Sequence, residues 1–206
     1  LIYVEDVLNV PTYIAKWIPI PFQISALVGL QIWTRVSNKL NRISALNYGA
    51  IMWIISCTAA LFLPSLSIIS GVGDSLFLNP GNIFLFILLI FIICLIGIGA
   101  STAFLIPWSL LPDAIDEDPE KPAGLYTAWM VLIQKIGIAF SVQLLGFLLY
   151  LSGYQSCFVD KDGLNIIEQC YSAQLTIRLC IGFIPSILVI IGLLIMRKWD
   201  RKLITN

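Results

Sequence analysis

Long uncharged apolar stretches alternate along the chain with short polar segments. A helix needs about 20 mostly apolar residues to cross the hydrocarbon core of a bilayer. Five stretches meet this requirement, and each is predicted to be a membrane-spanning helix: residues 11–34, 44–66, 82–108, 124–151 and 172–196. The first stretch carries Lys16 near one end and Pro19 and Pro21 inside, so its alternative is a half-inserted or amphipathic segment.

The composition agrees with a membrane protein and excludes several function classes. Of the 206 residues, 59% are apolar and only 12% are charged, whereas soluble domains carry about 25% charged residues. Twelve basic and twelve acidic residues cancel, which argues against a nucleic-acid partner. The chain has no histidine, and its five cysteines show no C-x-x-C spacing, so we expect neither a zinc site nor a histidine-based catalytic triad.

The basic residues are distributed unequally between the two sides of the membrane. The sides follow from the five predicted spans, which cross the membrane in alternating directions. Lysine and arginine in short loops mark the cytoplasmic side. Three lie on the other side, namely Lys16, Lys161 and Arg178, and eight lie on the side predicted to be cytoplasmic: Arg35, Lys39, Arg42, Lys121, Arg197, Lys198, Arg201 and Lys202. This predicts a cytoplasmic C-terminus. The opening residues lack the features of a signal peptide, which predicts a fragment of a longer chain.

Lys135 lies deep inside the fourth apolar stretch. It follows Gly124 by eleven residues, which corresponds to about 16 Å of helix. An ammonium group at that depth costs about 2.5 kcal/mol or more, and such residues usually face a substrate or ion pathway. The small and aliphatic residues on the same helical face suit an anionic or amphiphilic ligand. The alternative is a structural role, in an ion pair or in hydrogen bonds to the carbonyls of another helix.

A cluster of acidic residues follows the third apolar stretch, beyond Pro107 and Pro112, which we expect to loosen its end. If the chain keeps a helical turn there, Asp113 and Asp116 share a face. They would then help to close the cytoplasmic side, facing the basic connection that contains Arg35. The alternatives are a solvated acidic loop and a basic connection that only sets orientation. A paired-carboxylate hydrolase fits poorly, because nothing adjacent supplies a pocket.

Two cysteines lie in the last outer loop. Cys157 and Cys170 are thirteen positions apart, on the side that would be oxidising in a plasma membrane. They form a possible disulfide, but the spacing alone does not establish the geometry that a disulfide requires.

An aspartate pair, a glycine and a lysine occur in an order that resembles the glycoside-pentoside-hexuronide:cation symporters of the major facilitator superfamily. In that family an Asp-x-x-Asp motif at the cytoplasmic end of the tenth helix precedes a glycine and an eleventh helix with a lysine. Asp113, Asp116, Gly124 and Lys135 fit this order, and the resemblance covers essentially the whole chain. The segments AFLIPWSLLPDAID, GYQSC and IPSILVIIGLLIM look like the branch that carries lysophosphatidylcholine with sodium.

The resemblance implies an all-α membrane protein whose five transmembrane helices are helices eight to twelve of a twelve-helix carrier. Residues 1–206 would then be an incomplete C-terminal six-helix bundle. It also implies alternating access with sodium as the coupling ion, and contact between Lys135 and the polar group of the substrate. The sodium ligands would lie in the missing N-terminal half, so no metal ligand is assigned here. Glu117 and the segment EKPAG depart from the sugar-transporting pattern.

The expected function is therefore that of a secondary active transporter, a cation-coupled symporter for an amphiphilic solute such as a lysophospholipid. A sodium- or proton-coupled sugar symporter is the alternative within transport, and a non-transporting membrane scaffold is the alternative outside it. We expect no enzyme activity and no cofactor apart from the coupling ion. The expected partners are the solute, the lipid bilayer and the missing N-terminal half, but no nucleic acid. The expected location is the plasma membrane.

Overall fold

The structure, a computed structural model, describes residues 2–8, 10, 12–40, 42–63, 80–116, 123–154 and 171–204. These residues form helices and the turns between them, and no strand occurs among them, which confirms the all-α prediction. In chain order the elements are the π-helical turn η1 (Tyr3–Val7) and the helices α1 (Thr12–Ala15), α2 (Pro19–Lys39), α3 (Arg42–Leu61), α5 (Pro80–Asp116), α6 (Ala123–Leu151), α7 (Tyr171–Ile181) and α8 (Phe183–Ile204).

Four helical stretches of the described chain are long and apolar enough to cross a membrane. They are Arg42–Leu61, Ile83–Pro112, Ala123–Leu151 and Tyr171–Ile195. Helix α2 has a sufficient length of 21 residues but does not reach the same apolarity, because Gln23, Gln31 and Arg35 interrupt its apolar residues. The prediction of a multi-pass membrane protein is therefore confirmed, with α2 as the least apolar of the five expected spans.

The first expected span differs from the observed helix. Residues 11–34 were expected to form one helix, but the chain turns at Lys16–Ile18 and α2 begins at Pro19. Proline is favoured in the first turn of a helix, because its missing N–H would have no partner there and its φ is already helical. The prolines therefore mark the start of α2, which then continues beyond Thr34 to Lys39.

The third and fifth expected spans also differ from the structure. Helix α5 does not loosen near residue 108 but runs through Pro107 and Pro112 to Asp116, over 37 residues. The fifth span is divided at Gly182, where α7 ends and α8 begins. Pro185 has no N–H to donate to the preceding turn, and a break in the hydrogen-bond ladder at such a point is a common cause of a helix kink.

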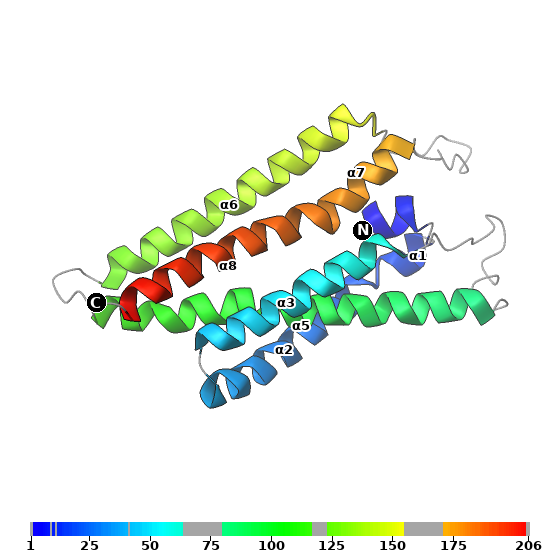
Figure 1. The fold of residues 1–206 in the computed structure, drawn as a ribbon. Helices are drawn as coiled ribbons and strands as arrows, with labels where there is room; N and C mark the ends of the chain where they lie inside the picture. The colour runs from blue at the N-terminus through cyan, green and yellow to red at the C-terminus, as the bar shows by residue number, and fades with distance from the viewer. Residues whose placement is uncertain are drawn as a thin grey trace.

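Helices α2 and α3 pack along α5 (Figure 1). At one end of the bundle α2 ends, α3 begins, α5 ends and α6 begins. We call this the basic end, because Lys39 and Arg42 lie there. We call the opposite end, which holds η1, the η1 end. The helix termini therefore lie at two opposite ends of the bundle. This is expected because successive predicted spans run in opposite directions.

Small residues allow α5 to approach both neighbours closely. Gly97 of α5 lies against Ser25 of α2, and a Cβ at this glycine would stand 2.7 Å from the carbonyl oxygen of Phe22. Gly99 faces the backbone of Trp53 on α3. Both glycines belong to the segment GIGAS, residues 97–101, whose small side chains permit this approach. Van der Waals contact between small residues is a main source of helix association in membranes, where lipid removes the hydrophobic driving force.

The hydroxyl groups buried between these helices are satisfied locally. Ser101 donates a hydrogen bond to the carbonyl of Ile98 at 2.6 Å, and Thr102 donates to that of Gly99 at 2.7 Å. The indole N–H of Trp33, on α2, also donates to the Ile98 carbonyl, at 2.8 Å. Within the described chain, no buried side-chain nitrogen or oxygen lacks a partner. This meets the main requirement for polar groups inside a bilayer.

Replacing Gly99 with alanine should destabilise the complete protein. The new Cβ would lie 2.9 Å from both Cα and N of Trp53, so the helices must separate, at a cost of about 1–3 kcal/mol. Thermal unfolding of the detergent-solubilised full-length protein measures this change. Gly192→Ala is the matched control, because nothing lies within 4 Å of the Cβ it would add. Equal unfolding temperatures for the two variants would contradict the packing described here.

Candidate functional site

Lys135 occupies the middle of α6, twelve residues after Ala123 and sixteen before Leu151. At 1.5 Å per residue these distances are about 18 Å and about 24 Å along the helix. Its side chain is exposed, and no described residue forms a hydrogen bond or an ion pair with it. An ammonium group can donate three hydrogen bonds and is suited to phosphate, carboxylate or hydroxyl oxygens.

The central part of α6 is not covered by the other described helices. Every residue from Lys135 to Gln143 is exposed, and nothing lies within 4 Å of the position of a Cβ on Gly137. Helix α6 contacts α7 and α5, whereas none of its Cα atoms comes within 8 Å of a Cα atom in the described part of α8. Lys135 is therefore presented on a long apolar surface that these helices leave open.

The two candidate aspartates lie in the last turn of α5. The helix continues to Asp116, so Asp113 and Asp116 are three residues apart on a helical backbone and belong to one face. The side chain of Asp116 is exposed. Residues 80–112 carry no charge, so these two aspartates are the first charged residues along α5.

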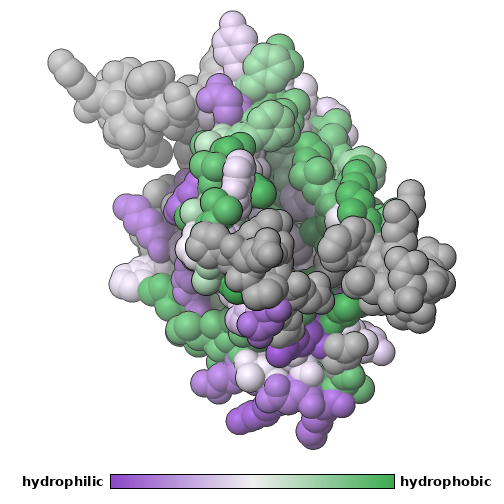
Figure 2. All heavy atoms as spheres, turned by 90° about the vertical axis from the view of Figure 1, so that its left-hand side faces the viewer, coloured by the Kyte–Doolittle hydropathy of each residue, from purple (hydrophilic) through white to green (hydrophobic). Residues whose placement is uncertain are grey.

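Arg42, rather than Arg35, contacts this end of α5. The Nη1 group of Arg42 donates a hydrogen bond to the carbonyl oxygen of Ser109 at 2.9 Å. Arg35 is exposed on α2. Figure 2 looks onto the basic end and shows hydrophilic side chains gathered at its lower edge, where α2 ends.

The position of Arg42 in the sequence is itself a signal of such a contact, because it is the first residue of α3. A basic residue in the first turn of a helix is opposed by the positive end of the helix dipole. An arginine at this position does not stabilise its own helix. Its presence therefore indicates a partner outside that helix. The Ser109 carbonyl, about two helical turns before the end of α5 at Asp116, is a partner of this kind.

At the η1 end, two side chains bind the last carbonyl groups of α3. Nη1 of Arg178, on α7, donates to the carbonyl oxygens of Leu61 at 2.9 Å and Leu63 at 3.1 Å. The hydroxyl of Tyr3 donates to the carbonyl of Ala60. The last carbonyls of a helix have no partners within it and carry partial negative charge, so a cation placed there is favourable.

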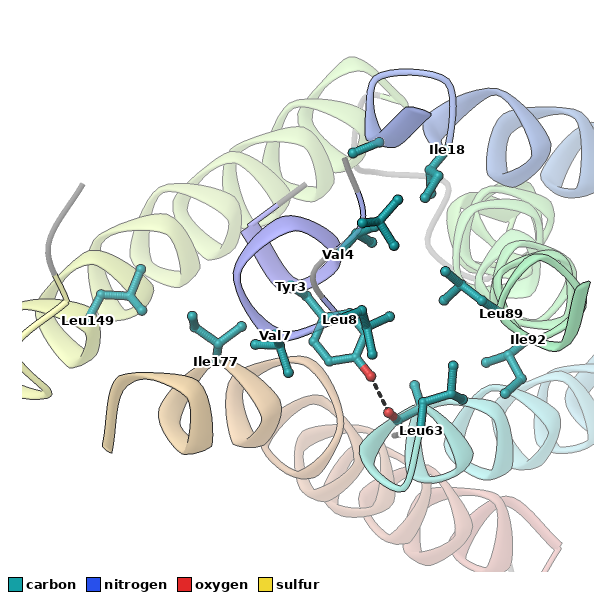
Figure 3. Packing of buried hydrophobic residues seen from close by; sticks show 13 residues of the cluster. Tyr3, Val4, Val7, Leu8, Ile18, Leu63, Leu89, Ile92, Leu149 and Ile177 are labelled. Atoms are coloured by element: carbon teal, nitrogen blue, oxygen red, sulfur yellow. Dashed lines mark hydrogen bonds between the residues drawn. The ribbon is translucent and has the colours of Figure 1, made fainter. Parts of the chain in front are cut away.

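Tyr3 is also part of the apolar cluster that fills the η1 end. Figure 3 shows its ring among Val7 of η1, Ile177 of α7 and Leu89 of α5, with its hydroxyl directed at α3. Burial raises the pKa of the Tyr3 phenol, and the positive charge of Arg178 opposes part of that rise. The phenol therefore remains a hydrogen-bond donor at neutral pH. Sequence reasoning identified neither Tyr3 nor the contact partners of Arg178, because both depend on helices distant in the chain.

The remaining candidates concern cysteines and metal ligands. Cys157 and Cys170 lie outside the described residues, so their pairing stays a prediction. Cys57, Cys94 and Cys180 are free thiols in the helices. Within the described ranges, no group of three or more histidine, cysteine, aspartate or glutamate residues is arranged to hold a metal ion.

Comparisons with known proteins identify similar sequences along nearly the whole chain. The family described as MFS/sugar transport protein matches residues 1–200. An uncharacterized symporter of Synechocystis sp. is 31% identical over 183 residues, which cover 86% of this chain and 30% of the relative. A sodium-dependent lysophosphatidylcholine symporter of Danio rerio is 28% identical over 125 residues, which cover 53% of this chain and 22% of the relative.

A third relative is a sphingosine-1-phosphate transporter of Xenopus tropicalis. It is 29% identical over 106 residues, which cover 48% of this chain and 19% of the relative. The chain thus spans less than a third of the length of each of these relatives. No solved structure matches the chain significantly. All three relatives are named as symporters or transporters.

Replacing Arg178 with methionine should destabilise the complete protein by about 2 kcal/mol. The substitution keeps much of the apolar stem but removes a charged donor from the carbonyls of Leu61 and Leu63, and hydrogen bonds to charged groups contribute about 1.5–3 kcal/mol. Thermal unfolding in detergent measures the loss. Lys16→Met serves as the control, because Lys16 is exposed. A loss no larger than that of the control would show that Arg178 does not stabilise α3.

Proposed function

The chain belongs to the MFS/sugar transport protein family, and from this premise we propose that the complete protein is a cation-coupled symporter for an amphiphilic organic solute such as a lysophospholipid. Its two halves would expose the solute site alternately to the two sides of the membrane. In transporters of this kind the site lies near the bilayer midplane, between the halves. The described helices would supply one wall of that site.

The observation that carries the proposal is the position of Lys135. Lys135 is a cation at the middle of a helix that is otherwise uncharged, on a part of α6 that the described helices leave uncovered. A lysine at membrane depth is costly unless it faces a polar ligand or a wet cavity. An anionic headgroup would pair with the ammonium group, and the surrounding apolar surface would accept an acyl chain.

The lipid solute is favoured by the relatives, and a sugar is the second candidate. Two relatives are named for lysophosphatidylcholine and sphingosine-1-phosphate, which both combine a phosphate with an apolar chain. The family description, in contrast, includes sugar transport. Uptake of labelled lysophosphatidylcholine and of a labelled disaccharide by the full-length protein, each with and without a sodium gradient, separates the candidates. Sodium-dependent uptake of the sugar alone would replace the lipid proposal.

Several features of the proposal concern parts outside the solute site. Sodium is proposed as the coupling ion because the lysophosphatidylcholine relatives are named as sodium-dependent, and its ligands are expected in the N-terminal half. We also propose that Asp113 and Asp116 attract basic residues such as Arg35, and that this attraction closes the basic end. The excess of basic residues there supports a cytoplasmic location of this end and of the C-terminus. The proposed location is the plasma membrane.

Replacing Lys135 with alanine in the full-length protein should abolish coupled uptake while leaving membrane insertion intact. The change removes the only cation in the middle of the described part of α6. Arginine at the same position should preserve part of the uptake, because it keeps the charge. Initial uptake rates, normalised to the amount of carrier in the membrane, provide the measurement. Normal uptake by Lys135→Ala would remove this residue from the solute site.

Replacing Asp113 or Asp116 with asparagine should slow turnover more than it weakens solute binding. Asparagine keeps the size of the side chain but removes the charge that would attract a basic partner when the basic end closes. Maximal uptake rate and apparent solute affinity, measured on the same membranes, separate the two effects. A changed affinity at an unchanged maximal rate would count against a role in closure.

A further inference from the structure

The η1 end of α6 is held by a helix-terminating motif. Gly153, with a φ of +74°, follows the last residues of the helix. Its N–H bonds to the carbonyl of Tyr150 at 3.2 Å, and the N–H of Tyr154 bonds to that of Leu149 at 3.1 Å. These two bonds define a Schellman motif, for which glycine is the preferred residue because it adopts a positive φ without strain. The motif fixes the direction in which Tyr154 leaves the helix.

Tyr154 links α6 to a distant part of the chain. Its hydroxyl donates a hydrogen bond to Oδ2 of Asp6 at 2.8 Å, between residues 148 positions apart. Asp6 belongs to η1, whose own position is fixed by the bond from Tyr3 to α3. Leu149 and Tyr154 both belong to the apolar cluster of this end. The terminus of α6 is therefore joined to the α3 side of the bundle through η1.

The middle of α6 has no comparable attachment. All residues from Lys135 to Gln143 are exposed, and Leu149 is the first buried residue beyond them. Ser172, at the start of α7, also donates to the carbonyl of Ser152 at 3.0 Å, but that bond joins α6 to its neighbour in the chain. The position of Lys135 therefore depends on how the two ends of α6 are held.

We propose that Asp6 and Tyr154 act as a latch that positions α6, and with it Lys135, for solute binding. They are positioning residues, because neither lies near the ammonium group. The hydrogen bond between them forms when the η1 end is closed and breaks when α6 moves away from η1. The role assigned to Lys135 rests on the proposed function, whereas the mechanical role of the latch does not.

A hydrogen bond to a carboxylate is strong enough for this role. Removing one donor or acceptor should shift the balance between latched and released α6 by about tenfold. If only the latched state binds solute well, the apparent affinity falls in proportion to the fraction of protein in that state. Tyr154→Phe should therefore raise the apparent KM severalfold with little change in the maximal rate.

The decisive measurement is a distance within the full-length protein. Bioorthogonal spin labels at Thr58 on α3 and Ser141 on α6, which are both exposed, report where the middle of α6 lies. Tyr154→Phe and Asp6→Ala should broaden or shift the distribution of this distance. Asp6→Asn keeps an acceptor oxygen and should restore most of the original distribution. Tyr150→Phe is the matched control, because Tyr150 is on the same helical end and is 80% exposed.

The outcomes separate the latch from the transported solute. An unchanged distribution in Tyr154→Phe, or equal changes in Tyr154→Phe and Tyr150→Phe, would overturn the latch. Equal effects of Asp6→Asn and Asp6→Ala would overturn the role of the hydrogen bond. If the wild-type protein takes up no lysophospholipid but the distance still responds to Tyr154→Phe, the latch stands and the proposed solute is wrong.

Discussion

The close approach of α5 to α2 and α3 is the constraint on which the rest of this bundle depends. In lipid, apolar side chains gain little by leaving the solvent, so helices associate where small residues let their backbones come together. Gly97 and Gly99 provide this on two sides of α5. The three helices then form a firm base. Of the remaining helices, α8 packs along α3 and α7 is tied to the end of α3 by Arg178, while Arg42 joins α3 to α5 within the base.

This division into a firm base and attached helices suits a carrier. A transporter must hold one set of helices together while another set changes its neighbours. At the η1 end the attachments combine hydrogen bonds to main-chain carbonyls and to one carboxylate with the apolar cluster that includes Tyr3 and Leu149. In contrast, α6 presents its central residues without cover from the described helices, so in the proposed carrier its neighbours could differ between states.

Much of the fold was predictable because a membrane-spanning helix needs a continuous apolar stretch, and such a stretch can be recognised in the sequence without knowledge of tertiary contacts. Long apolar stretches indicate the helices. The errors occurred where local rules compete. The pattern places Pro19 and Pro21 inside the first span, but they begin α2, and it predicts that Pro107 and Pro112 loosen a helix that continues to Asp116. The prominence of Lys135 followed from its depth alone, but the partners of Tyr3, Arg42 and Tyr154 depend on tertiary contacts that no local pattern encodes.

The division of the last span at Gly182 gives the bundle a joint. On one side of it, α7 is tied to α3 by Arg178 and to the end of α6 by Ser172. On the other side, α8 packs along α3 and has no such ties among the described residues. A straight helix would transmit any tilt at one membrane surface directly to the other. Two helices joined at a break can tilt more independently, so a tilt of α8 at the basic end need not displace the contacts of α7 at the η1 end.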